Sequence, residues 1–576
     1  MKKSEFSMII KLMIVTLSKE RKGDDFLFDT GSIQWDKEVD VIVLGSGGAA
    51  LTAAVAAAEN GANVLVLEKT HQIGGTTAYS GGVPWIPLNH YMKEAGFEDN
   101  REDAITFIKR LSLGRADDHM IETFVDKGHE IIKFLHDNTP VKFTTPLSYP
   151  EYYKRMDEAL KNGTRSLDPA PFDLNEIGEW GALLRQNPIF PPLTLEEGGA
   201  VGGIDFQLVA ERMQKNIVTM GRSLVASLFK ACLDRGVETL IETAGKDLVI
   251  NNDGQVIGVV AETKDGEILH FAASKGVILA SGGFEWNKQL IKAFLKAEIT
   301  HPVTPPGNEG DALMMAMKAG AALANMSEAW WYPAMVDPTF EYEDHVMAQL
   351  GSGRNGPNSI IVNKYGRRFV HEGTTYNDMP RSFFNFDPVK MEFPNEAPVW
   401  LIFDQQLKDS QLIITMMPGD PAPEWVDQAD SIRALAEKIG VDPDGLEDEI
   451  RKWNEYCEQG EDPDFHRGTI QFEALTTGGG SPENNLGKIE KGPFYALPIY
   501  LGALGTNGGP KINENGQVVD FKGEPIKGLY AAGNASANPL GPIYPSAGGT
   551  IGPAMVFGFL AGQHAANLAE QPAVNY

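Results

Sequence analysis

The first clear hydrophobic pattern along the chain covers residues 41–68, which read VIVLGSGGAALTAAVAAAENGANVLVLE. An apolar run is followed by a glycine turn, an alanine-rich stretch of helical length and a second apolar run that ends in an acid. Short, continuous apolar runs bounded by turns are typical of strands buried on both faces of a parallel sheet. The pattern therefore predicts a strand–turn–helix–strand unit of an α/β fold.

The glycine turn of this unit has the spacing G-x-G-x-x-A at Gly45, Gly47 and Ala50. The first glycine permits a tight turn, the second lets the backbone approach a pyrophosphate, and the alanine allows close helix–strand packing. Glu68 follows the first glycine by 68 − 45 = 23 positions, where an acid is expected to accept hydrogen bonds from ribose hydroxyls. The predicted cofactor contacts here are Gly45, Ser46, Gly47, Gly48, Ala49, Ala50, Glu68 and Lys69.

A second glycine-rich loop, KTHQIGGTTAYSGGVPWIP, occupies residues 69–87, where a nicotinamide-binding fold normally continues into its next strand and helix. Backbone amides and small hydroxyls suit a pyrophosphate and the edge of a flat ring, because larger side chains would block the approach. The loop therefore favours a flavin over a nicotinamide. Its predicted contacts are Gly74, Gly75, Thr76, Thr77, Ser80, Gly81 and Gly82.

Further along the chain the pattern predicts helices over residues 102–136, 221–235 and 311–324, and an irregular aromatic stretch over 140–192. Residues 246–280 alternate in polarity and are interrupted by Asp253-Gly254 and Asp265-Gly266, which are hairpin turn sequences. They lead into GVILASGGF at residues 276–284, a buried strand followed by glycines. A strand meander at this place is typical of two-dinucleotide-binding-type flavin folds.

Near residue 329 the sequence pattern changes to one that predicts mixed helix and strand, with charged helices over 430–439 and 444–459. The glycine-rich and small-residue pattern of the first part returns over 528–566. We therefore expect an N-terminal arm (1–36), a cofactor domain in two parts (37–328 and 500–576) and an inserted α+β catalytic domain (329–499). The helix beginning near residues 549–552 is expected to face the electron-rich edge of a reduced flavin. The remaining predicted cofactor residues are Ala280, Gly282, Asp311, Gly533, Asn534, Gly549 and Ile551.

Composition narrows the function classes. The formal net charge of −28 argues against nucleic acid and anionic membranes as partners. The two cysteines, Cys232 and Cys457, are far apart and exclude a disulfide framework or a cysteine-ligated metal, so we expect no metal site and a cytoplasmic location. The apolar residues 8–17 are interrupted by Lys11 and are too short to span a bilayer, which leaves a peripheral membrane contact as the alternative.

These motifs together resemble the fumarate reductase/succinate dehydrogenase flavoprotein superfamily and, within it, most closely the 3-ketosteroid Δ1-dehydrogenases. The resemblance runs from about residue 39 to residue 566. The resemblance rests on the sequence motifs VIVLGSGGAALTAA, LEKTHQIGGTTAYSGG, VILASGGFEWN, GDALMMAMKAGAA, GRRFVHEGTTYND, FHRGT, GPFYALPI, LGTNGGPKIN, GLYAAGNASA and YPSAGGTIGPAM. The early motifs imply FAD as the cofactor, and three later features narrow the substrate.

The first of these features is GRRFVHEGTTYND at residues 366–378. Soluble fumarate reductases are similar here but place an arginine after the two threonines, and an arginine suits a dicarboxylate by bidentate pairing. This chain has Tyr376 at that position. The resemblance implies that Tyr376 is the catalytic base of a ketosteroid dehydrogenase, while a role as pocket lining is the alternative.

The second feature is Tyr544-Pro545-Ser546-Ala547-Gly548. In the dehydrogenases that it resembles, a Tyr-Pro-x-x-Gly sequence supplies a phenol and a backbone N–H to the steroid 3-keto oxygen, which implies these roles for Tyr544 and Gly548. Two donors that converge on an oxygen gaining charge form an oxyanion hole. Packing beside a glycine turn, or a flavin contact by Gly548 alone, is the alternative.

The third feature is SYPEYYK at residues 148–154. The family has a tyrosine here that hydrogen-bonds the base, and the resemblance assigns this role to Tyr152, with Tyr153 and Tyr149 as competitors. A free tyrosine has a pKa near 10, and a phenol that donates to the base is expected to lower that pKa. Aromatic residues at 330–332 and 85–87 are expected either to wall an apolar pocket for a flat polycycle or to pack in the core.

The sequence thus predicts an FAD enzyme that introduces a 1,2 double bond into the A-ring of 3-ketosteroids. Tyr544 and Gly548 polarise the ketone, and Tyr376, aided by Tyr152, removes the carbon-2 proton. The carbon-1 hydride passes to FAD, and a quinone is the expected external electron acceptor. The alternatives are a Δ4-(5α)-dehydrogenase that uses Tyr544 and Ser546, a reductase of an unsaturated carboxylate, and a non-catalytic flavoprotein. The steroid side-chain preference and the oligomeric state are left open.

Overall fold

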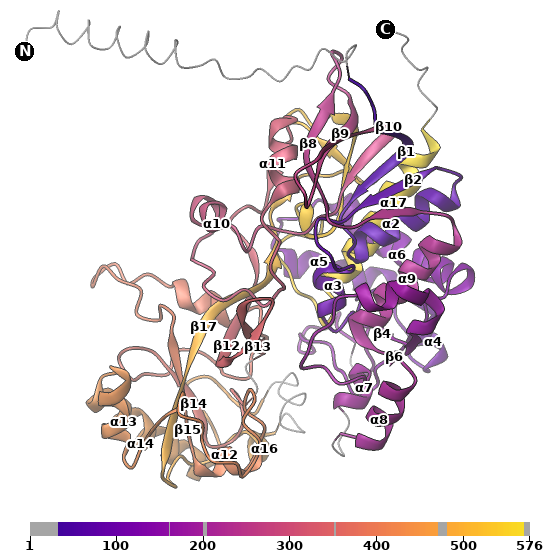
Figure 1. Cartoon of the computed structure of the whole chain (residues 1–576). Coiled ribbons are helices and arrows are strands. Elements are labelled where there is room, and N and C mark those ends of the chain that lie inside the picture. Colours follow the sequence, from indigo (N-terminus) through magenta and orange to yellow (C-terminus); the bar gives the residue numbers. More distant parts are fainter. Residues whose placement is uncertain (1–32, 161, 200–203, 351–352, 470–480, 569–576) are drawn as a thin grey trace, which may run out of the picture.

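The computed structural model describes residues 33–160, 162–199, 204–350, 353–469 and 481–568. The predicted N-terminal arm falls almost wholly outside these ranges, as does the apolar segment 8–17. Figure 1 shows two bodies joined by long strands, a larger one that contains both ends of the described chain and a smaller one that contains its middle. Within the described ranges no helix combines the length and the apolar character needed to cross a bilayer.

The larger body is built on a mainly parallel sheet with the strand order β19-β20-β10-β1-β2-β7. Its central strand β1 pairs in parallel with β2 on one side and with β10 on the other. These central strands are almost completely buried, which explains why they read as unbroken apolar runs. The strands are β1 (Lys37–Leu44), β2 (Val64–Leu67), β7 (Glu238–Leu240), β10 (Ile268–Leu279), β19 (Gln517–Val519) and β20 (Pro525–Ala531).

Two helices rich in small residues, α2 (Gly48–Glu59) and α17 (Ile551–Asn567), pack closely against one another, although they lie at opposite ends of the chain. A Cβ atom added to Gly558 would lie 2.5 Å from the carbonyl oxygen of Ala49, and one added to Gly562 would lie 2.1 Å from that of Ala53. Helices can approach this closely only where small residues face each other. The predicted alanine-rich helix and C-terminal helix are therefore confirmed, and the packing explains their composition.

The strand meander is also confirmed: β8 (Thr243–Ile250) and β9 (Val256–Thr263) form antiparallel pairs that lead into β10. The helix predicted over 102–136 is two helices, α5 (Arg101–Ser112) and α6 (Asp118–Asn138), because Leu113 and Gly114 adopt positive φ values of 52° and 76°. Helix α9 spans Met220–Asp234, as expected.

The prediction of a helix over residues 311–324 is wrong in its length, because the observed helix is shorter. Helix α11 spans Asp311–Lys318, and Gly320, with a φ of +86°, ends it. The chain then enters a short strand, β11 (Leu323–Ala324), which pairs with β18 (Gly509–Pro510). The glycine is the sequence feature that marks this boundary.

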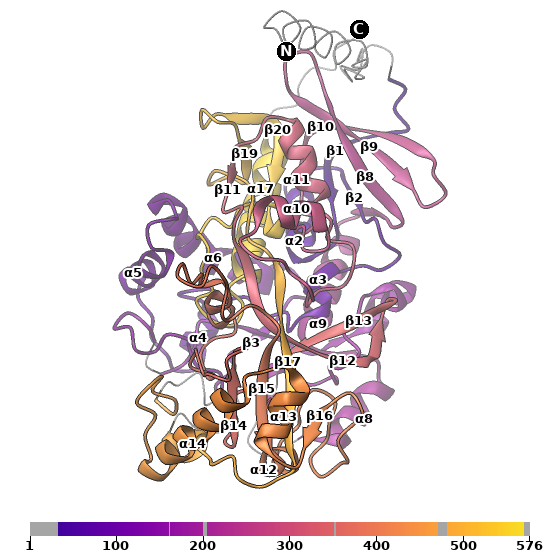
Figure 2. The ribbon, with the colours of Figure 1, turned by 90° about the vertical axis from the view of Figure 1, so that its left-hand side faces the viewer.

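The smaller body contains a six-stranded sheet with the order β13-β12-β17-β15-β14, and β16 also pairs with β17. Figure 2 shows β12 and β17 reaching from this sheet toward the larger body. The proposed boundary at 329 coincides with the start of β12, and β17 runs across the one proposed at 499. The elements are β12 (Ala329–Tyr342), β13 (His345–Leu350), β14 (Ser359–Val362), β15 (Val399–Asp404), β16 (Asp427–Ala429), β17 (Phe494–Thr506), α13 (Ile432–Ile439) and α14 (Pro443–Gln459).

Candidate active site

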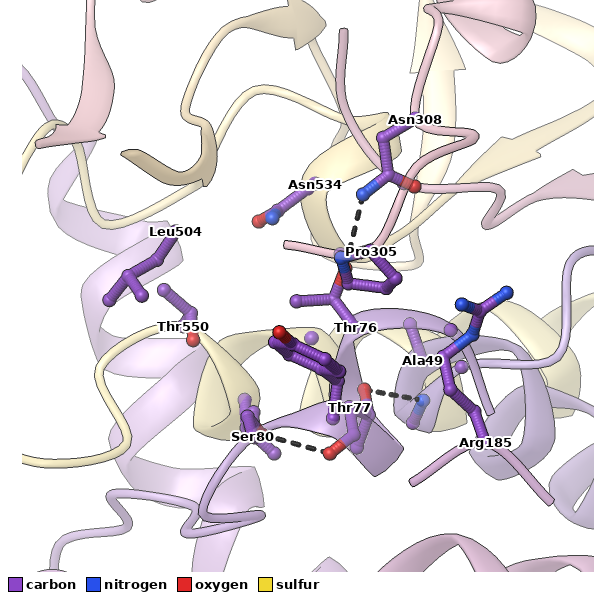
Figure 3. Close-up of a pocket in the computed structure, with 18 of the residues that line it drawn as sticks. Ala49, Thr76, Thr77, Ser80, Arg185, Pro305, Asn308, Leu504, Asn534 and Thr550 are labelled. Carbon is purple, nitrogen blue, oxygen red and sulfur yellow. Dashed lines mark hydrogen bonds between the residues drawn. The ribbon is translucent and has the colours of Figure 1, made fainter. Parts of the chain in front are cut away.

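A pocket extends from the glycine turn after β1 to the region where the two bodies meet (Figure 3). Three predicted cofactor residues do not line it: Ala50 packs in the core, and Gly74 and Gly549 lie behind the wall. The predicted cofactor residues that do line it are Gly45, Ser46, Gly47, Gly48, Ala49, Glu68, Lys69, Gly75, Thr76, Thr77, Ser80, Gly81, Gly82, Ala280, Gly282, Asp311, Gly533, Asn534 and Ile551.

Hydrogen bonds fix the glycine turn against the second glycine-rich loop. The amide of Gly48 donates to Oγ1 of Thr77 over 3.0 Å (Figure 3). The hydroxyl of Ser46 donates to the carboxylate of Glu68 over 2.6 Å and accepts from the amide of Gly74 over 2.9 Å. Gly74 thus supports the pocket from behind, and the carboxylate of Glu68 is held at its edge. The two loops form one continuous cradle.

The residues of this cradle fit a flavin dinucleotide. Gly45 has a φ of +103°, and a Cβ there would lie 2.5 Å from the carbonyl oxygen of Ala280. Ser281 lines the pocket, and its buried hydroxyl has no hydrogen-bond partner among the described residues, so a ligand is expected to satisfy it. The helix α2 begins at the turn and directs backbone N–H groups toward a phosphate.

Some lining residues were not predicted from the sequence. Asn308 donates to Oγ1 of Thr76 over 3.0 Å and to Glu285 over 2.6 Å. Arg185 lines the pocket and forms an ion pair with Glu343, which lies at the turn between β12 and β13. Both contacts join segments that are far apart in the sequence, so no local pattern indicated them.

Three tyrosines predicted to act together do meet in this pocket. The hydroxyl of Tyr152 donates to the hydroxyl of Tyr376 over 3.1 Å. The ring of Tyr544 lies 5.2 Å from that of Tyr376 and 6.2 Å from that of Tyr152, measured between centroids. All three residues line the same pocket as the glycine cradle. The geometry therefore places a cluster of phenols beside the expected cofactor.

The structure also shows where Tyr153 and Tyr149 lie, the two alternatives to Tyr152 as the residue that hydrogen-bonds Tyr376. Tyr153 donates to a carboxylate oxygen of Asp378 over 2.5 Å and packs outside the pocket lining. Tyr149 lines the pocket and hydrogen-bonds Tyr152. Of the three, Tyr152 is therefore the one whose hydroxyl lies next to that of Tyr376.

Gly548 lies beside Tyr544 in the pocket wall, and its amide acts to lower the pKa of the Tyr544 phenol. Gly548 has a φ of +95°, and a Cβ there would lie 2.5 Å from the carbonyl oxygen of Val83. Its own carbonyl accepts a 3.1 Å hydrogen bond from the amide of Trp85. The phenol of Tyr544 and the backbone N–H of Gly548 therefore lie close together in the pocket wall.

The expectation that Tyr152 lowers the pKa of Tyr376 is wrong for the pocket as it stands. Burial raises the pKa of Tyr376 and of Tyr152 well above the usual value, and the neighbouring phenols add to this effect. Burial also raises the pKa of Tyr544 to about 12. Removing these hydroxyls from water disfavours the charged form, and for Tyr376 the hydrogen bond shared with Tyr152 raises the pKa further.

Some of the aromatic residues predicted to wall the pocket face it, and others pack in a core. In β12 this follows from the alternation of side chains along the strand. In β12, Trp330 and Tyr332 face the phenols, and the ring of Trp330 lies 5.7 Å from that of Tyr544. Trp331 points to the opposite face and packs in the core of the smaller body. Trp85 is fully buried in the larger core. Tyr332 therefore adds a further phenol to the pocket wall.

Comparison with known proteins identifies the family of this chain. Residues 40–551 match a family described as FAD binding domain. The chain is 35% identical over 558 residues to a 4-oxocyclohexanecarboxylate 2-dehydrogenase of Sinomonas cyclohexanicum, covering 92% of this chain and 93% of that protein. It is 36% identical over 563 residues to a 3-oxosteroid 1-dehydrogenase of Mycolicibacterium smegmatis, covering 91% and 96% of the two chains.

Among solved structures, the chain is similar to a 3-ketosteroid Δ1-dehydrogenase from Sterolibacterium denitrificans in complex with 1,4-androstadiene-3,17-dione. The TM-score is 0.84 and the identity 30%, and the match covers 92% of this chain and 99% of that one. The matched region includes both bodies of the fold. The chain belongs to the FAD binding domain family, within it to the 3-ketosteroid dehydrogenase group of flavoprotein oxidoreductases, and its cofactor is FAD.

Proposed function

We propose that the protein dehydrogenates 3-ketosteroids at carbons 1 and 2. The observation that carries this proposal is the convergence of Tyr152, Tyr376 and Tyr544 in the pocket that also holds the FAD cradle. The solved relative in complex with a 1,4-diene-3-one steroid supports the same chemistry. Apolar residues such as Val303, Met347 and Leu504 line the remaining wall and suit a flat hydrocarbon skeleton.

In the proposed reaction, the Tyr544 hydroxyl and the Gly548 amide donate to the ketone oxygen and stabilise the negative charge that it gains. This makes the carbon-2 hydrogen acidic, and the oxygen of Tyr376 takes that proton. Tyr152 holds Tyr376 in place through its hydrogen bond. FAD, when bound, supplies the acceptor for the carbon-1 hydride, and a quinone is the proposed external acceptor.

The Δ4-(5α) alternative needs Ser546 next to the substrate. Ser546 is fully buried, and its hydroxyl donates to the carbonyl of Pro150 over 3.5 Å. It does not belong to the pocket lining, whereas Tyr152 does. This arrangement favours dehydrogenation at carbons 1 and 2.

A second candidate substrate is a small ring ketone that carries a carboxylate. The 35% identity to a 4-oxocyclohexanecarboxylate 2-dehydrogenase favours it, because that protein also abstracts hydrogens next to a ring ketone. The same phenols would serve both substrates, since each presents a ketone with an acidic neighbouring carbon. The two candidates differ only in the size and charge of the remainder of the molecule.

The experiment is anaerobic addition of a substrate to the FAD-loaded enzyme. 4-Androstene-3,17-dione should bleach the flavin band and yield a product two hydrogens lighter, with the new double bond at carbons 1 and 2. In a separate sample, a saturated 5α-3-ketosteroid is the substrate, and the position of the new double bond distinguishes dehydrogenation at carbons 1 and 2 from Δ4-(5α)-dehydrogenation. A parallel sample receives 4-oxocyclohexanecarboxylate, and bleaching by that compound alone would replace the steroid with the small ring ketone. An unbleached flavin with both compounds would overturn the proposed function.

A further inference from the structure

Two side chains that follow Tyr376 in the chain contact the larger body. The segment that carries Tyr376 lies between β14 and β15 and runs into the 3₁₀ helix η3 (Met379–Phe384). Asp378 lies two positions after Tyr376, and Arg381 lies five positions after it. Each contacts a loop of the larger body that holds another of the predicted catalytic tyrosines. The segment is therefore attached to the larger body at more points than the tyrosine pair alone.

The first contact joins Asp378 to the loop of Tyr152. The hydroxyl of Tyr153, the next residue in the chain, donates to a carboxylate oxygen of Asp378 over 2.5 Å, and Oγ1 of Thr375 donates to the same oxygen over 2.8 Å. Burial and the charge of Asp378 raise the pKa of Tyr153 well above its usual value, so this phenol keeps its proton and remains a donor. The bond between Tyr153 and Asp378 therefore joins the same two segments as the bond between Tyr152 and Tyr376.

The second contact joins Arg381 to the loop of Tyr544. A terminal nitrogen of Arg381 donates to the backbone carbonyl of Pro542 over 2.8 Å. Pro542 lies two positions before Tyr544. Nε of Arg381 also lies 3.8 Å from a carboxylate oxygen of Asp378, three positions earlier in the chain. The side chain of Arg381 therefore connects the Tyr544 loop with the residue that binds the Tyr152 loop.

The segment is also bonded within the smaller body. Arg354 donates to the backbone carbonyl of Thr374 over 2.9 Å and to that of Glu372. These bonds fix the backbone just before Tyr376 to the smaller body. The contacts with the larger body therefore decide where the Tyr376 hydroxyl lies relative to the other phenols.

The proposed reaction requires groups from both bodies to meet at one ring of the substrate. The ketone oxygen and the proton on the neighbouring carbon are a few bonds apart, so Tyr544 and Tyr376 must reach the same ring at once. A misplacement of about 1 Å can cost about 10²-fold in rate. The 3.1 Å bond between Tyr152 and Tyr376 is a single contact between two side chains, which leaves the segment free to rotate about it. Two further contacts restrict that rotation.

We propose that Asp378 and Arg381 are positioning residues that keep the proton acceptor Tyr376 aligned with the catalytic tyrosines of the larger body. Asp378 acts through its bond to Tyr153, and Arg381 acts through its bond to Pro542. Neither Asp378 nor Arg381 belongs to the described pocket lining, so both act through other residues. This inference rests on the proposed function, and it adds the contacts that hold the catalytic groups of the two bodies together.

The first test removes each contact and leaves the pocket lining unchanged. Tyr153→Phe deletes the donor to Asp378, and Arg381→Met deletes the donor to Pro542 but keeps a long side chain. Each variant is first checked for bound FAD and for the wild-type circular dichroism spectrum. With the ketone that bleaches the flavin, kcat is expected to fall about tenfold to a hundredfold, whereas KM changes less than about threefold because the substrate-binding groups remain. Arg381→Lys, which can still donate to the carbonyl, should recover most of the lost kcat.

Two matched controls distinguish alignment of Tyr376 from the general loss of a bond. Arg155→Met removes another bond between the two bodies, since Arg155 donates to the carbonyl of Thr469 over 2.8 Å. Tyr456→Phe removes another hydroxyl–carboxylate bond, to Asp464 at 3.2 Å within the smaller body. Both controls should keep a near-wild-type kcat. An equal fall of kcat in Arg155→Met and Arg381→Met would overturn the inference, because any loosening between the bodies would then have the same effect.

A second measurement does not depend on turnover. Amide hydrogen exchange of the FAD-loaded, ligand-free enzyme is followed by mass spectrometry. Exchange should rise over residues 149–153 and 375–384 in Tyr153→Phe, and over 375–384 and 541–548 in Arg381→Met, but not over these ranges in the controls. If the wild-type enzyme oxidises no ketone, the proposed function fails, and the exchange result alone decides whether the two contacts position the segment of Tyr376. Folded, FAD-loaded variants with unchanged exchange, or with a wild-type kcat, overturn the inference.

Discussion

The hydroxyl of Tyr152 donates a 3.1 Å hydrogen bond to the hydroxyl of Tyr376, although 224 positions separate the two residues in the chain. Tyr152 belongs to a loop of the larger body, and Tyr376 lies in the connection between β14 and β15 of the smaller one. The pair therefore forms only when the two bodies pack together. The ion pair of Arg185 with Glu343 joins the bodies at the same pocket.

Replacing Tyr376 with phenylalanine should abolish most activity without loss of FAD. The ring remains, so packing against Tyr544 and Tyr332 is preserved, while the proton acceptor is removed. General-base catalysis typically contributes about 10²–10⁴-fold, and kcat should fall by that order. The matched control is Tyr495→Phe, which removes a hydroxyl bonded to Gln405 in the same body but outside the pocket. A Tyr376→Phe enzyme with near-normal kcat would contradict the assignment.

Replacing Tyr544 with phenylalanine should lower kcat/KM by about 10²–10³-fold, the usual cost of one oxyanion donor. The Gly548 amide would remain as the single donor to the ketone oxygen. Binding of a product analogue, measured through the flavin spectrum, should weaken much less than the rate falls, because the charge on oxygen develops in the transition state. Equal losses in affinity and rate would point to a binding role only.

The pH dependence follows from the burial of the phenols. Tyr376 acts as a base only when ionised, and burial raises its pKa, so kcat/KM is expected to rise with pH through the range from about 6 to 10. Tyr544 must stay protonated, and its pKa of about 12 keeps it so across this range. Steady-state rates in overlapping buffers test this, and a profile falling above neutral pH would contradict it.

Trp85 supports the site from behind, and Trp85→Phe should destabilise the fold. Its indole N–H contacts the buried carboxylate of Glu151 at 3.2 and 3.3 Å, directly beside Tyr152 in the chain. Removing this donor from a buried carboxylate is expected to lower the free energy of unfolding by about 1–3 kcal/mol. Trp286→Phe, which loses a bond to the hydroxyl of Thr304, is the control and should cost less in denaturant titration.

Gly45→Ala should release FAD. A methyl group at this position would lie 2.5 Å from the carbonyl oxygen of Ala280 in the floor of the cradle. Gly61→Ala is the matched control, because Gly61 also has a positive φ, +82°, but a methyl group there has no atom within 4 Å. The ratio of flavin to protein absorbance measures retention. Similar retention in both variants would remove the glycine turn from the cofactor site.

Much of the cofactor domain could be predicted from the sequence because its determinants are local. The glycine spacing, the apolar strands and Glu68 lie within 28 residues, 41–68, and the structure places nearly all of the predicted contacts in the pocket wall. The error at 311–324 has a local cause as well, since Gly320 ends the helix that the apolar pattern alone would extend.

Asn308, Arg185 and Tyr332 could not be predicted in the same way. Each acts through contacts with segments distant in the chain, and nothing in the neighbouring sequence distinguishes it from an ordinary surface or core residue. The expected pKa of Tyr376 failed for the same reason. Burial is a property of the packed molecule, and in the packed pocket the hydrogen bond with Tyr152 raises the pKa of Tyr376 instead of lowering it.

The sequence by itself determined the strand–glycine–helix cradle, the FAD cofactor and the set of tyrosines available for chemistry, because short-range backbone geometry and residue type suffice for these. Only the tertiary structure decided which tyrosines meet and how deeply they are buried. The distances between the hydroxyls and the local dielectric depend on how the two bodies pack. That packing depends on contacts between residues far apart in the chain.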